Sequence, residues 1–306
     1  MFTPGRLGAI ASKFRRGAAM SSLADGTSGK PSEPVIVGQS NMDSNNVILR
    51  ATGVKKSYGS VKVLTDVNFD LRQGEVHALI GDNGAGKSTF IKILSGVVCL
   101  DGGSIELYGQ LANFISPHDA QDAGIETVYQ DLALALTLDA SENVYLGREL
   151  LRKGLLGRMG FLDRQLMHDR TAVAMKGMGI TLKSVSAPVS ALSGGQRQGV
   201  AVVRAAMWER KILIMDEPTA ALGQKQTAEV RNMIKRSRDE LGISIILISH
   251  SLPFVFEVAD RITVMRHGRS ILRCAASEAS TDQLIGAMTG SSAEVPPRSV
   301  FRMGTE

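Results

Sequence analysis

Cysteines, long apolar runs and blocks of one charge are all scarce in this chain of 306 residues. Its two cysteines, Cys99 and Cys274, are too few and too far apart in sequence for a disulfide framework or a C-x-x-C metal site. Such sparse cysteine usage fits a reducing cytoplasm. No run approaches the roughly 18 consecutive apolar residues that a membrane-spanning helix needs. These absences exclude a disulfide-stabilised scaffold and an integral membrane span.

The charge distribution disfavours a dedicated nucleic-acid-binding protein. The net charge is +5, but the 35 Lys and Arg residues are interspersed with 30 Asp and Glu residues. A nucleic-acid-binding surface would instead concentrate its cations in one run or patch. A hydrophobic content of 43% is sufficient for a buried core, and the length fits one large domain or one and a half small ones.

The N-terminal segment, residues 1–46, differs in composition from the rest. It is rich in Gly, Ser and Pro and has no apolar periodicity, so we predict a disordered leader. Its Arg-rich, acid-poor start also resembles an organellar transit peptide or a membrane-surface segment. Translation that begins at Met20 or Met42 would make the leader an artefact of the assigned start. These interpretations stay open. The basic residues that precede the first acid are Arg6, Lys13, Arg15 and Arg16.

Alternating strand and helix patterns begin near residue 47. Short apolar runs bounded by Gly or Asp predict strands, and apolar residues at helical spacing predict the helices between them. This alternation predicts an α/β fold with a mostly parallel core sheet. A segment at about 131–205 lacks strand-like runs and is predicted to be a helical insertion. The predicted strands are 67–71, 76–80, 104–108, 126–130, 212–215 and 245–249, and the predicted helices are 87–94, 224–241 and one from Pro253.

A complete phosphate-binding loop follows the strand at 76–80. It reads Gly81-Asp82-Asn83-Gly84-Ala85-Gly86-Lys87-Ser88 and matches G-x-x-x-x-G-K-[ST]. Its glycines let backbone N–H groups point at the β-phosphate, and Lys87 reaches the β and γ oxygens. Ser88 would bind Mg²⁺, and Thr89 would contact the α-phosphate near the positive end of the next helix. A chance glycine-rich turn is the alternative, but the strand before and the helix after favour the phosphate loop.

Two adjacent carboxylates, Asp216 and Glu217, end the predicted strand at 212–215. Adjacent carboxylates at the end of a buried strand are costly without cations, and an ATPase needs both a Mg²⁺ partner and a base there. We expect Asp216 to bind the metal, directly or through water, and Glu217 to polarise the attacking water. The alternative is a salt-bridged strand end without a catalytic role.

A second glycine-flanked helix start is formed by Ser193-Gly194-Gly195-Gln196. Its S-x-x-Q pattern predicts a capping box, in which the first and fourth residues exchange hydrogen bonds. Two separate sets of backbone donors for one triphosphate predict a nucleotide held between two subunits. The alternative is a polar loop that caps an ordinary helix.

Segments 81–89, 192–198 and 214–219 together resemble the nucleotide-binding subunit of ATP-binding cassette (ABC) transporters. The resemblance covers about residues 47–290, and the Ser193 motif is its most specific part. It implies a P-loop NTPase fold with a mostly parallel core sheet, an antiparallel β-subdomain and a helical insertion. It also implies an ATPase that uses ATP and Mg²⁺. The remaining residues, 291–306, are expected to form a flexible C-terminal tail.

The same resemblance implies roles for further residues. Ser193, Gly194 and Gly195 would contact the γ-phosphate bound by the opposite subunit, so ATP would hold a head-to-tail homodimer with two composite sites. No internal repeat of the domain is visible, which predicts one nucleotide module per chain. Gly223 stands where many relatives have Asp, which puts the usual contact of that acid across the dimer in doubt.

Three single residues acquire roles from the resemblance. Tyr58, expected in a loop, would stack on adenine; Gln130, expected at a strand end, would touch Mg²⁺ and the water; His250 would hydrogen-bond the γ-phosphate. For each, an ordinary structural role is the alternative. The other histidines are taken as structural by default.

Four further segments resemble bacterial monosaccharide importers of the ribose, xylose and fructose type. This similarity implies membrane permease subunits and a periplasmic sugar-binding protein as partners, and a peripheral location at the cytoplasmic face of the inner membrane. A groove between the helical insertion and the core, near Gln130, would receive a permease helix. We expect no residue here to touch sugar. The four segments are 124–130, 143–149, 219–223 and 287–290.

Other functions compete with sugar import. The first is an ABC importer ATPase for another small solute. A soluble ABC ATPase acting on DNA or ribosomes would show long heptad insertions, paired C-x-x-C motifs or two linked cassettes, and none is present in this sequence. A regulatory protein that binds but does not hydrolyse nucleotide is a further alternative.

Overall fold

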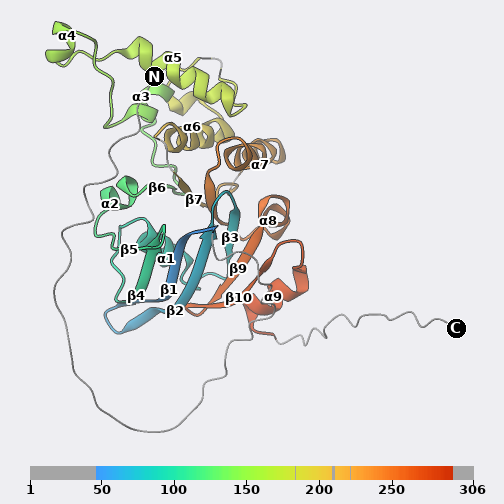
Figure 1. Cartoon of the computed structure of the whole chain (residues 1–306). Coiled ribbons are helices and arrows are strands. Elements are labelled where there is room, and N and C mark those ends of the chain that lie inside the picture. The colour runs from blue at the N-terminus through green and yellow to red at the C-terminus, as the bar shows by residue number, and fades with distance from the viewer. Residues whose placement is uncertain (1–45, 183, 209–210, 221, 292–306) are drawn as a thin grey trace, which may run out of the picture. The chain divides into compact units, whose positions relative to one another are not determined.

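A computed structural model describes residues 46–182, 184–208, 211–220 and 222–291 (Figure 1). The predicted leader, apart from Asn46, and the predicted tail, apart from Ser291, lie outside the described residues. Their predicted disorder therefore stays a prediction. Among the described residues, no helix is both long and apolar enough to cross a bilayer.

One mixed sheet organises the described chain. It has 10 strands in the order β5-β4-β1-β2-β10-β9-β3-β8-β7-β6. Strands β9, β3, β8, β7 and β6 pair in parallel, whereas β5, β4, β1 and β2 pair antiparallel. The predicted parallel core sheet and antiparallel β-subdomain are thus confirmed. The strands are β1 (Val47–Tyr58), β2 (Val61–Arg72), β3 (Val76–Ile80), β4 (Gly102–Leu107), β5 (Gln110–Ala112), β6 (Ile125–Val128), β7 (Ile212–Asp216), β8 (Ser244–Ile248), β9 (Arg261–Arg266) and β10 (Arg269–Ala275).

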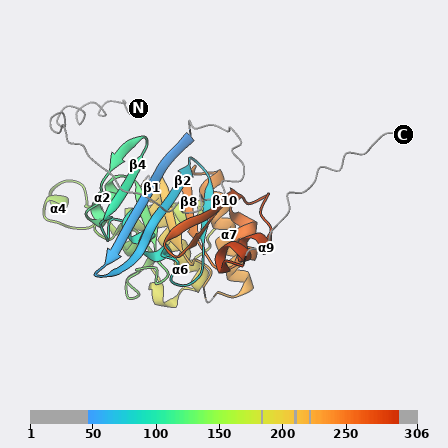
Figure 2. The same ribbon diagram turned by 90° about the horizontal axis from the view of Figure 1, so that it is seen from below.

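Strand β10 joins the two parts of the sheet. It pairs antiparallel with β9 and meets β2 through one parallel pair, Arg269 with Asp66. Figure 2 shows the antiparallel strands β4, β1 and β2 side by side, with β10 beyond β2.

Helices cover the core strands and form the insertion. Helices α3, α5 and α6 pack on one another, and α6 also packs on α7 and β6 (Figure 1). The insertion also contains long loops and a short 3₁₀ turn at Val189–Ala191. The helices are α1 (Lys87–Leu94), α2 (Pro117–Asp122), α3 (Ala140–Tyr145), α4 (Leu155–Arg158), α5 (Arg164–Gly177), α6 (Gly194–Met207), α7 (Gln224–Asp239), α8 (Leu252–Val258) and α9 (Thr281–Thr289).

The core strands are apolar almost throughout because both faces are covered. Every residue of β3 and β8 is buried, and in β7 only the last residue, Asp216, is partly exposed. Such continuous burial is typical of parallel strands between helical layers. The register pairs Leu79 with Ile248 and Asp216 with Ile248, so β3, β7 and β8 end at the same edge of the sheet. Ligands of open α/β sheets bind at such an edge.

Several expected boundaries are wrong by one to six residues, and three of them bear on the site or its neighbours. Tyr58 is the last residue of β1 rather than a loop residue, because it pairs with Val61 across a hairpin. Strand β6 ends at Val128, since the chain turns where the Leu132 N–H donates to the Tyr129 carbonyl, and Gln130 lies in that turn. Helix α7 ends at Asp239 instead of residue 241.

Candidate functional site

The phosphate loop joins β3 to α1 and depends on glycine at two tightly packed positions. Gly86 has φ 102°, and a Cβ there would lie 2.5 Å from Leu64 Cδ2 of β2. Gly81 has φ 155°, and its Cβ would run into the Met265 carbonyl oxygen of β9. Both positions need left-handed or strained backbone close to neighbouring strands, which only glycine tolerates well. Close packing against β2 and β9 therefore holds the phosphate loop in its conformation.

Lys87 folds back over the loop that precedes it. Its Nζ donates to the carbonyl oxygens of Gly81 at 2.5 Å and Asp82 at 3.0 Å. Burial lowers the pKa of Lys87, and the nearby carboxylates of Glu217, Asp216 and Asp82 act against that shift. A partly desolvated ammonium held only by carbonyl oxygens is well suited to bind the stronger charge of a phosphate.

Helix α1 offers free N–H groups at its start. Its N-cap residue is Gly86, which makes no side-chain capping bond, and no acidic residue lies in the first turn. Ser88 and Thr89 lie in that first turn. An uncapped helix N-terminus carries partial positive charge and favours an anion.

Asp216 is the last residue of β7, and Glu217 follows it at the same sheet edge. Burial raises the pKa of Asp216, and the adjacent Glu217 carboxylate raises it further, while Lys87 and Lys92 oppose both effects. Glu217 has φ 50°, a left-handed conformation that is rare for a residue other than glycine. Its N–H donates to the Ile248 carbonyl at 3.0 Å, which holds it in place. Strain of this kind persists where surrounding structure enforces it and often marks functional sites.

The structure brings His250 to Glu217. His250 Nδ1 lies 2.6 Å from Glu217 Oε1 and donates a hydrogen bond to it. His250 is exposed, whereas Glu217 is partly buried. The residue expected to be the base is therefore in direct contact with the histidine expected to sense the γ-phosphate.

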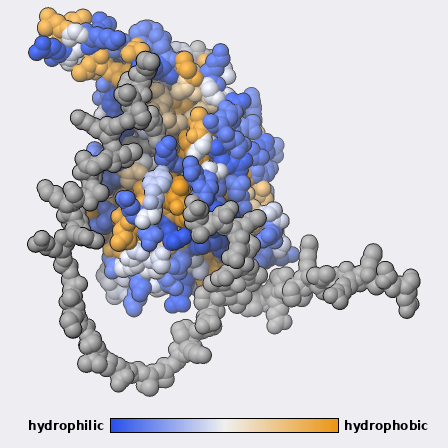
Figure 3. Space-filling model, viewed as in Figure 1, coloured by the Kyte–Doolittle hydropathy of each residue, from blue (hydrophilic) through white to orange (hydrophobic). Residues whose placement is uncertain are grey.

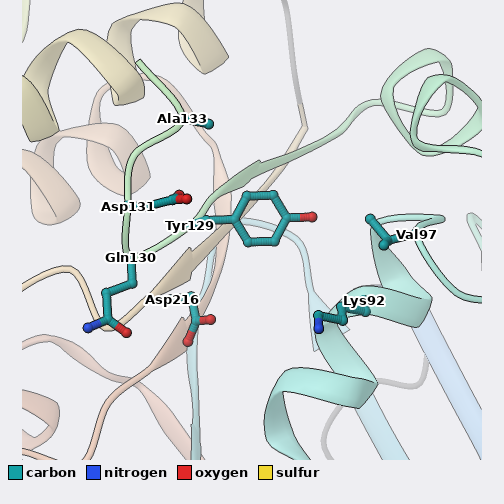
Figure 4. A pocket seen from close by; sticks show the side chains of 7 residues that line it. All are labelled: Lys92, Val97, Tyr129, Gln130, Asp131, Ala133 and Asp216. Atoms are coloured by element: carbon teal, nitrogen blue, oxygen red, sulfur yellow. The ribbon is translucent and has the colours of Figure 1, made fainter. Parts of the chain in front are cut away.

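Gln130 and Asp216 line one pocket of about 690 Å³ (Figure 4). The loop after Gln130 is strained, because Leu132 and Ala133 have φ of 60° and 44°. The lining residues are Lys92, Val97, Tyr129, Gln130, Asp131, Ala133 and Asp216. Sequence reasoning missed Lys92 and Tyr129, although Lys92 follows Lys87 on the same helix and Tyr129 precedes Gln130.

The polar groups at this edge fit Mg²⁺. Burial and a second carboxylate make the negative charge of Asp216 costly, and a cation would relieve that cost. Ser88 and Gln130 add hydroxyl and amide oxygens, the type of ligand that Mg²⁺ prefers. Among the described residues no three His, Cys, Asp or Glu side chains gather as a metal cluster. Mg²⁺ needs no such cluster, since it usually keeps waters and substrate phosphates.

Ser193 begins α6, and its predicted capping box is confirmed. Ser193 Oγ accepts from the Gln196 N–H at 3.3 Å, and Gln196 Oε1 accepts from the Ser193 N–H at 3.0 Å. A Cβ on Gly194 would lie 2.6 Å from Leu222 Cδ2, and one on Gly195 would lie 2.7 Å from Glu229 Oε2. The two glycines therefore allow the start of α6 to pack closely on the segment around α7.

Within one chain, the Ser193 segment does not join the phosphate loop. Figure 1 shows α6 among α3, α5 and α7, clearly apart from α1. Helix α6, which follows Ser193, is therefore separate from α1, which follows the phosphate loop.

Tyr58 and Gly223 lie in positions accessible to a ligand or partner. Tyr58 is 46% exposed, and Lys56 Nζ lies 5.8 Å from the centroid of its ring. Tyr58 pairs with Val61 of β2, the same strand whose Leu64 packs near Gly86, so the ring belongs to the hairpin beside the phosphate loop. Gly223 is the N-cap of α7 and supplies no side-chain capping bond.

Comparison with known proteins agrees with this geometry. Residues 64–220 match the ABC transporter family. The chain is 47% identical over 253 residues to the Fructose import ATP-binding protein FrcA of Rhizobium meliloti, covering 82% of this chain and 96% of that protein. It is 39% identical over 258 residues to the Ribose import ATP-binding protein RbsA 2 of Burkholderia cenocepacia, covering 84% of this chain but only 50% of that longer relative.

A solved structure shares the fold. It is cbiO1 from Clostridium perfringens, described as part of the ABC transporter complex cbiONQ, with a TM-score of 0.66 and 27% identity. The match covers 78% of this chain and 93% of cbiO1.

Proposed function

The chain belongs to the ABC transporter family, and from that membership we propose that it hydrolyses ATP to power the import of a monosaccharide through a separate membrane permease. The observation that carries the proposal is the meeting of the phosphate loop, Asp216 and the hydrogen-bonded pair of Glu217 and His250 at one sheet edge. Binding and hydrolysis of a triphosphate require these groups together.

ATP would be bound mainly by charge and backbone donors. The loop N–H groups and the start of α1 face the phosphates, and Lys87 exchanges its two carbonyl partners for the β and γ oxygens. Ser88, Asp216 and Gln130 would hold Mg²⁺, which supplies charge neutralisation at the phosphates. The exposed ring of Tyr58 would stack on the adenine.

Hydrolysis would proceed by positioning a water molecule. Glu217 accepts a proton from this water, whose oxygen bonds to the γ-phosphorus while the bond to the bridging oxygen breaks, giving ADP and phosphate. His250 is hydrogen-bonded to Glu217 in the structure, so its shift toward the γ-phosphate would free the base. Nucleotide binding and activation of the base are therefore coupled through one imidazole.

The site would be completed by a second copy of the chain. Ser193, Gly194 and Gly195 of that copy would face the γ-phosphate, since in one chain α6 lies apart from α1. ATP would then close a homodimer, and loss of the γ-phosphate would release it. We propose this symmetric arrangement as the simplest one for a chain with a single cassette.

Import would also depend on a permease and a binding protein. The pocket beside Gln130 is a suitable receiver for a helix from the permease, because its strained loop can change conformation when that helix moves. A periplasmic binding protein would select the sugar, and the cassette would act peripherally at the cytoplasmic face of the inner membrane. The two relatives, named for fructose and ribose import, favour a monosaccharide over another small solute.

Replacement of the base tests the proposal. Glu217→Gln should lower ATP turnover by about 10²-fold or more, the usual effect of removing a general base, while ATP still drives dimer formation measured by light scattering. Glu240→Gln, at the C-cap of α7, is the matched control and should behave as wild type.

The partner proposal needs the complete transporter. Wild-type chain reconstituted with its permease and binding protein should show ATP turnover stimulated by one of fructose, ribose or xylose. Absence of turnover in that system would contradict the hydrolytic function, and stimulation by a different solute class alone would contradict the sugar assignment.

A further inference from the structure

The segment around α4 exposes a group of apolar side chains. Residues 150–162, here called the α4 patch, lie at the outer edge of the helical insertion (Figure 1). Figure 3 shows hydrophobic atoms intermingled with hydrophilic ones at this end. The apolar side chains are between 45% and 73% exposed and belong to Leu151, Leu155, Leu156, Met159 and Phe161. Exposure of so many apolar groups in one short segment marks an interaction surface.

The α4 patch has a defined backbone structure. The Arg152 N–H donates to the Phe161 carbonyl at 2.9 Å, and the Asp163 N–H donates to the Leu150 carbonyl at 2.6 Å. An isolated bridge pairs Leu151 with Leu162. The two ends of the segment therefore lie next to each other where it joins the insertion. Helix α4 lies between these ends, at the tip of the segment. Its apolar side chains are exposed by the fold itself.

Unpaired cations lie between these apolar residues. No Asp or Glu occurs from Leu150 to Leu162, whereas Arg152, Lys153 and Arg158 are exposed. Within the part of the chain that the structure describes, these three cations form no ion pair. The flanking acids are occupied locally: Glu149 accepts from the Gly147 N–H, and Asp163 accepts from the Leu166 N–H at the start of α5. The patch therefore has a local charge of one sign.

We propose that the α4 patch binds the anionic surface of a phospholipid bilayer. Apolar side chains interleaved with Lys and Arg suit the boundary between headgroups and acyl chains, where the cations meet lipid phosphates and the apolar groups enter the boundary. A protein interface would instead gather its apolar residues in a charge-depleted core and would contain little Lys. Long, flexible side chains at the tip of a turn also match a fluid surface better than a shaped one.

This contact goes beyond the proposed function, in which the permease alone brings the cassette to the membrane. Direct lipid binding would orient the helical insertion at the bilayer independently of the pocket beside Gln130. It would also raise the local concentration of the cassette next to its permease. The two ideas can fail separately, because the α4 patch contains none of the residues assigned to ATP hydrolysis.

Vesicle binding by the full chain without its permease tests the charge contribution. Wild type should bind vesicles of phosphatidylglycerol and phosphatidylcholine, bind less as salt rises, and bind phosphatidylcholine alone only weakly. Arg152→Glu/Lys153→Glu/Arg158→Glu should weaken binding by at least about tenfold, since each cation near an anionic surface is worth roughly fivefold in affinity. The matched control, Arg50→Glu/Lys55→Glu/Lys225→Glu, changes the net charge equally at exposed positions elsewhere and should retain most of the binding.

A second variant tests the apolar contribution. Leu155→Ser/Met159→Ser should weaken binding to the same vesicles severalfold, whereas Leu111→Ser/Val173→Ser, at equally exposed apolar positions, should not. All four variants should keep the ATP turnover of wild type.

Three results would overturn the proposal. The patch variants could bind anionic vesicles as tightly as wild type, which would assign lipid binding to another part of the chain. Wild type could bind neutral vesicles equally well, which would remove the role of charge. Wild type could bind vesicles only when they contain the permease, which would make the partner a protein.

Discussion

At the scale of single residues, the site depends on positions where one side chain or its absence decides the geometry. Gly86 and Gly84 both have left-handed backbone in the phosphate loop, with φ of 102° and 83°. Only Gly86 is also crowded, since a Cβ there would approach Leu64, whereas nothing lies within 4 Å of a Cβ on Gly84. Substitutions at Gly84 and Gly86 can therefore distinguish the cost of backbone strain from the cost of a steric conflict.

Gly86→Ala should therefore cost more than Gly84→Ala. Backbone strain alone costs about 1–2 kcal/mol for a non-glycine residue, and the conflict with Leu64 adds to it only in Gly86→Ala. Urea unfolding measures both free energies of unfolding, and nucleotide titration should show weaker ATP binding by Gly86→Ala. Equal losses for the two variants would show that packing against β2 does not constrain the loop.

Another residue-scale feature is a buried ion cluster at the opposite end of the strands from the site. Arg261 Nη1 lies 2.8 Å from Asp70 Oδ2 and 3.1 Å from Glu75 Oε1, and Arg273 also contacts Asp70. Burial by itself would raise the pKa of Asp70, but hydrogen bonding to Arg261 and the charges of Arg273 and Arg261 hold it below its usual value. His77 is fully buried beside them, and burial lowers its pKa while Glu75 opposes that shift.

Arg261→Met should destabilise the protein by about 3–5 kcal/mol near neutral pH, because it leaves the buried Asp70 carboxylate without its main partner and removes one partner of Glu75. The pKa of Asp70 and that of Glu75 are depressed in the folded state, so their contribution is present above the unfolded value near pH 4 and is lost on further acidification. The gap in unfolding free energy between wild type and variant should thus narrow below about pH 4. Arg50→Met, at an exposed position of β1, is the control. A gap that widens in acid would contradict this assignment.

At the scale of elements, the helices that begin at predicted site residues differ in how their N-termini are capped. Helix α6 has a full capping box from Ser193 and Gln196, whereas α1 starts at an uncapped Gly86. In the site that we propose, the uncapped start would leave its N–H groups for phosphate, and the capped start would present the Ser193 segment to a partner copy. Helix α7 starts at Gly223, which has extended backbone, with φ −74° and ψ 167°.

Gly223→Asp should stabilise the protein relative to Gly223→Ala. No atom lies within 4 Å of a Cβ at this position, so both side chains fit, but only Asp can accept from the N–H groups at the start of α7. The difference in unfolding free energy should be about 0.5–2 kcal/mol in favour of Asp. Thermal or urea unfolding measures it, and equal stability of the two variants would show that this helix start needs no cap.

At the scale of the whole molecule, our proposal gives a single chain two incomplete halves of a nucleotide site. The phosphate loop lies at one sheet edge, and the Ser193 segment lies with α3, α5 and α7. Our proposal of a composite site makes a prediction about mixtures of two defective chains. This prediction depends on how two chains associate in a dimer rather than on any single contact within one chain.

Lys87→Ala and Ser193→Arg should each be almost inactive alone but should restore activity when mixed. A mixed dimer pairs the intact loop of the Ser193→Arg chain with the intact Ser193 of the Lys87→Ala chain, giving one complete site. With random pairing of equal amounts, about a quarter of all sites are complete, so about a quarter of wild-type ATP turnover is expected if sites act independently. Mixed dimers that form, as seen by native mass spectrometry, yet stay inactive would contradict the independent composite sites.

The sequence by itself determined the local features of this protein. The phosphate loop, the capping box at Ser193 and the apolar strands before Gly81 and Asp216 are written in neighbouring residues, because backbone conformation and burial follow local pattern. Boundaries at Tyr58 and Gln130 were misplaced because a hairpin pairing and a strained turn end those elements.

Only the tertiary structure decided which distant residues meet. The register of β3, β7 and β8 brings His250 to Glu217 and Lys92 into the pocket with Gln130, and the sheet order brings Arg261 to Asp70. The tertiary structure also decides which apolar residues are exposed. The spacing of Leu155 and Met159 in the sequence would suit a buried helix face equally well, yet both residues are exposed in the α4 patch. Contacts between residues far apart in the chain depend on strand order and register, which no short stretch of sequence encodes.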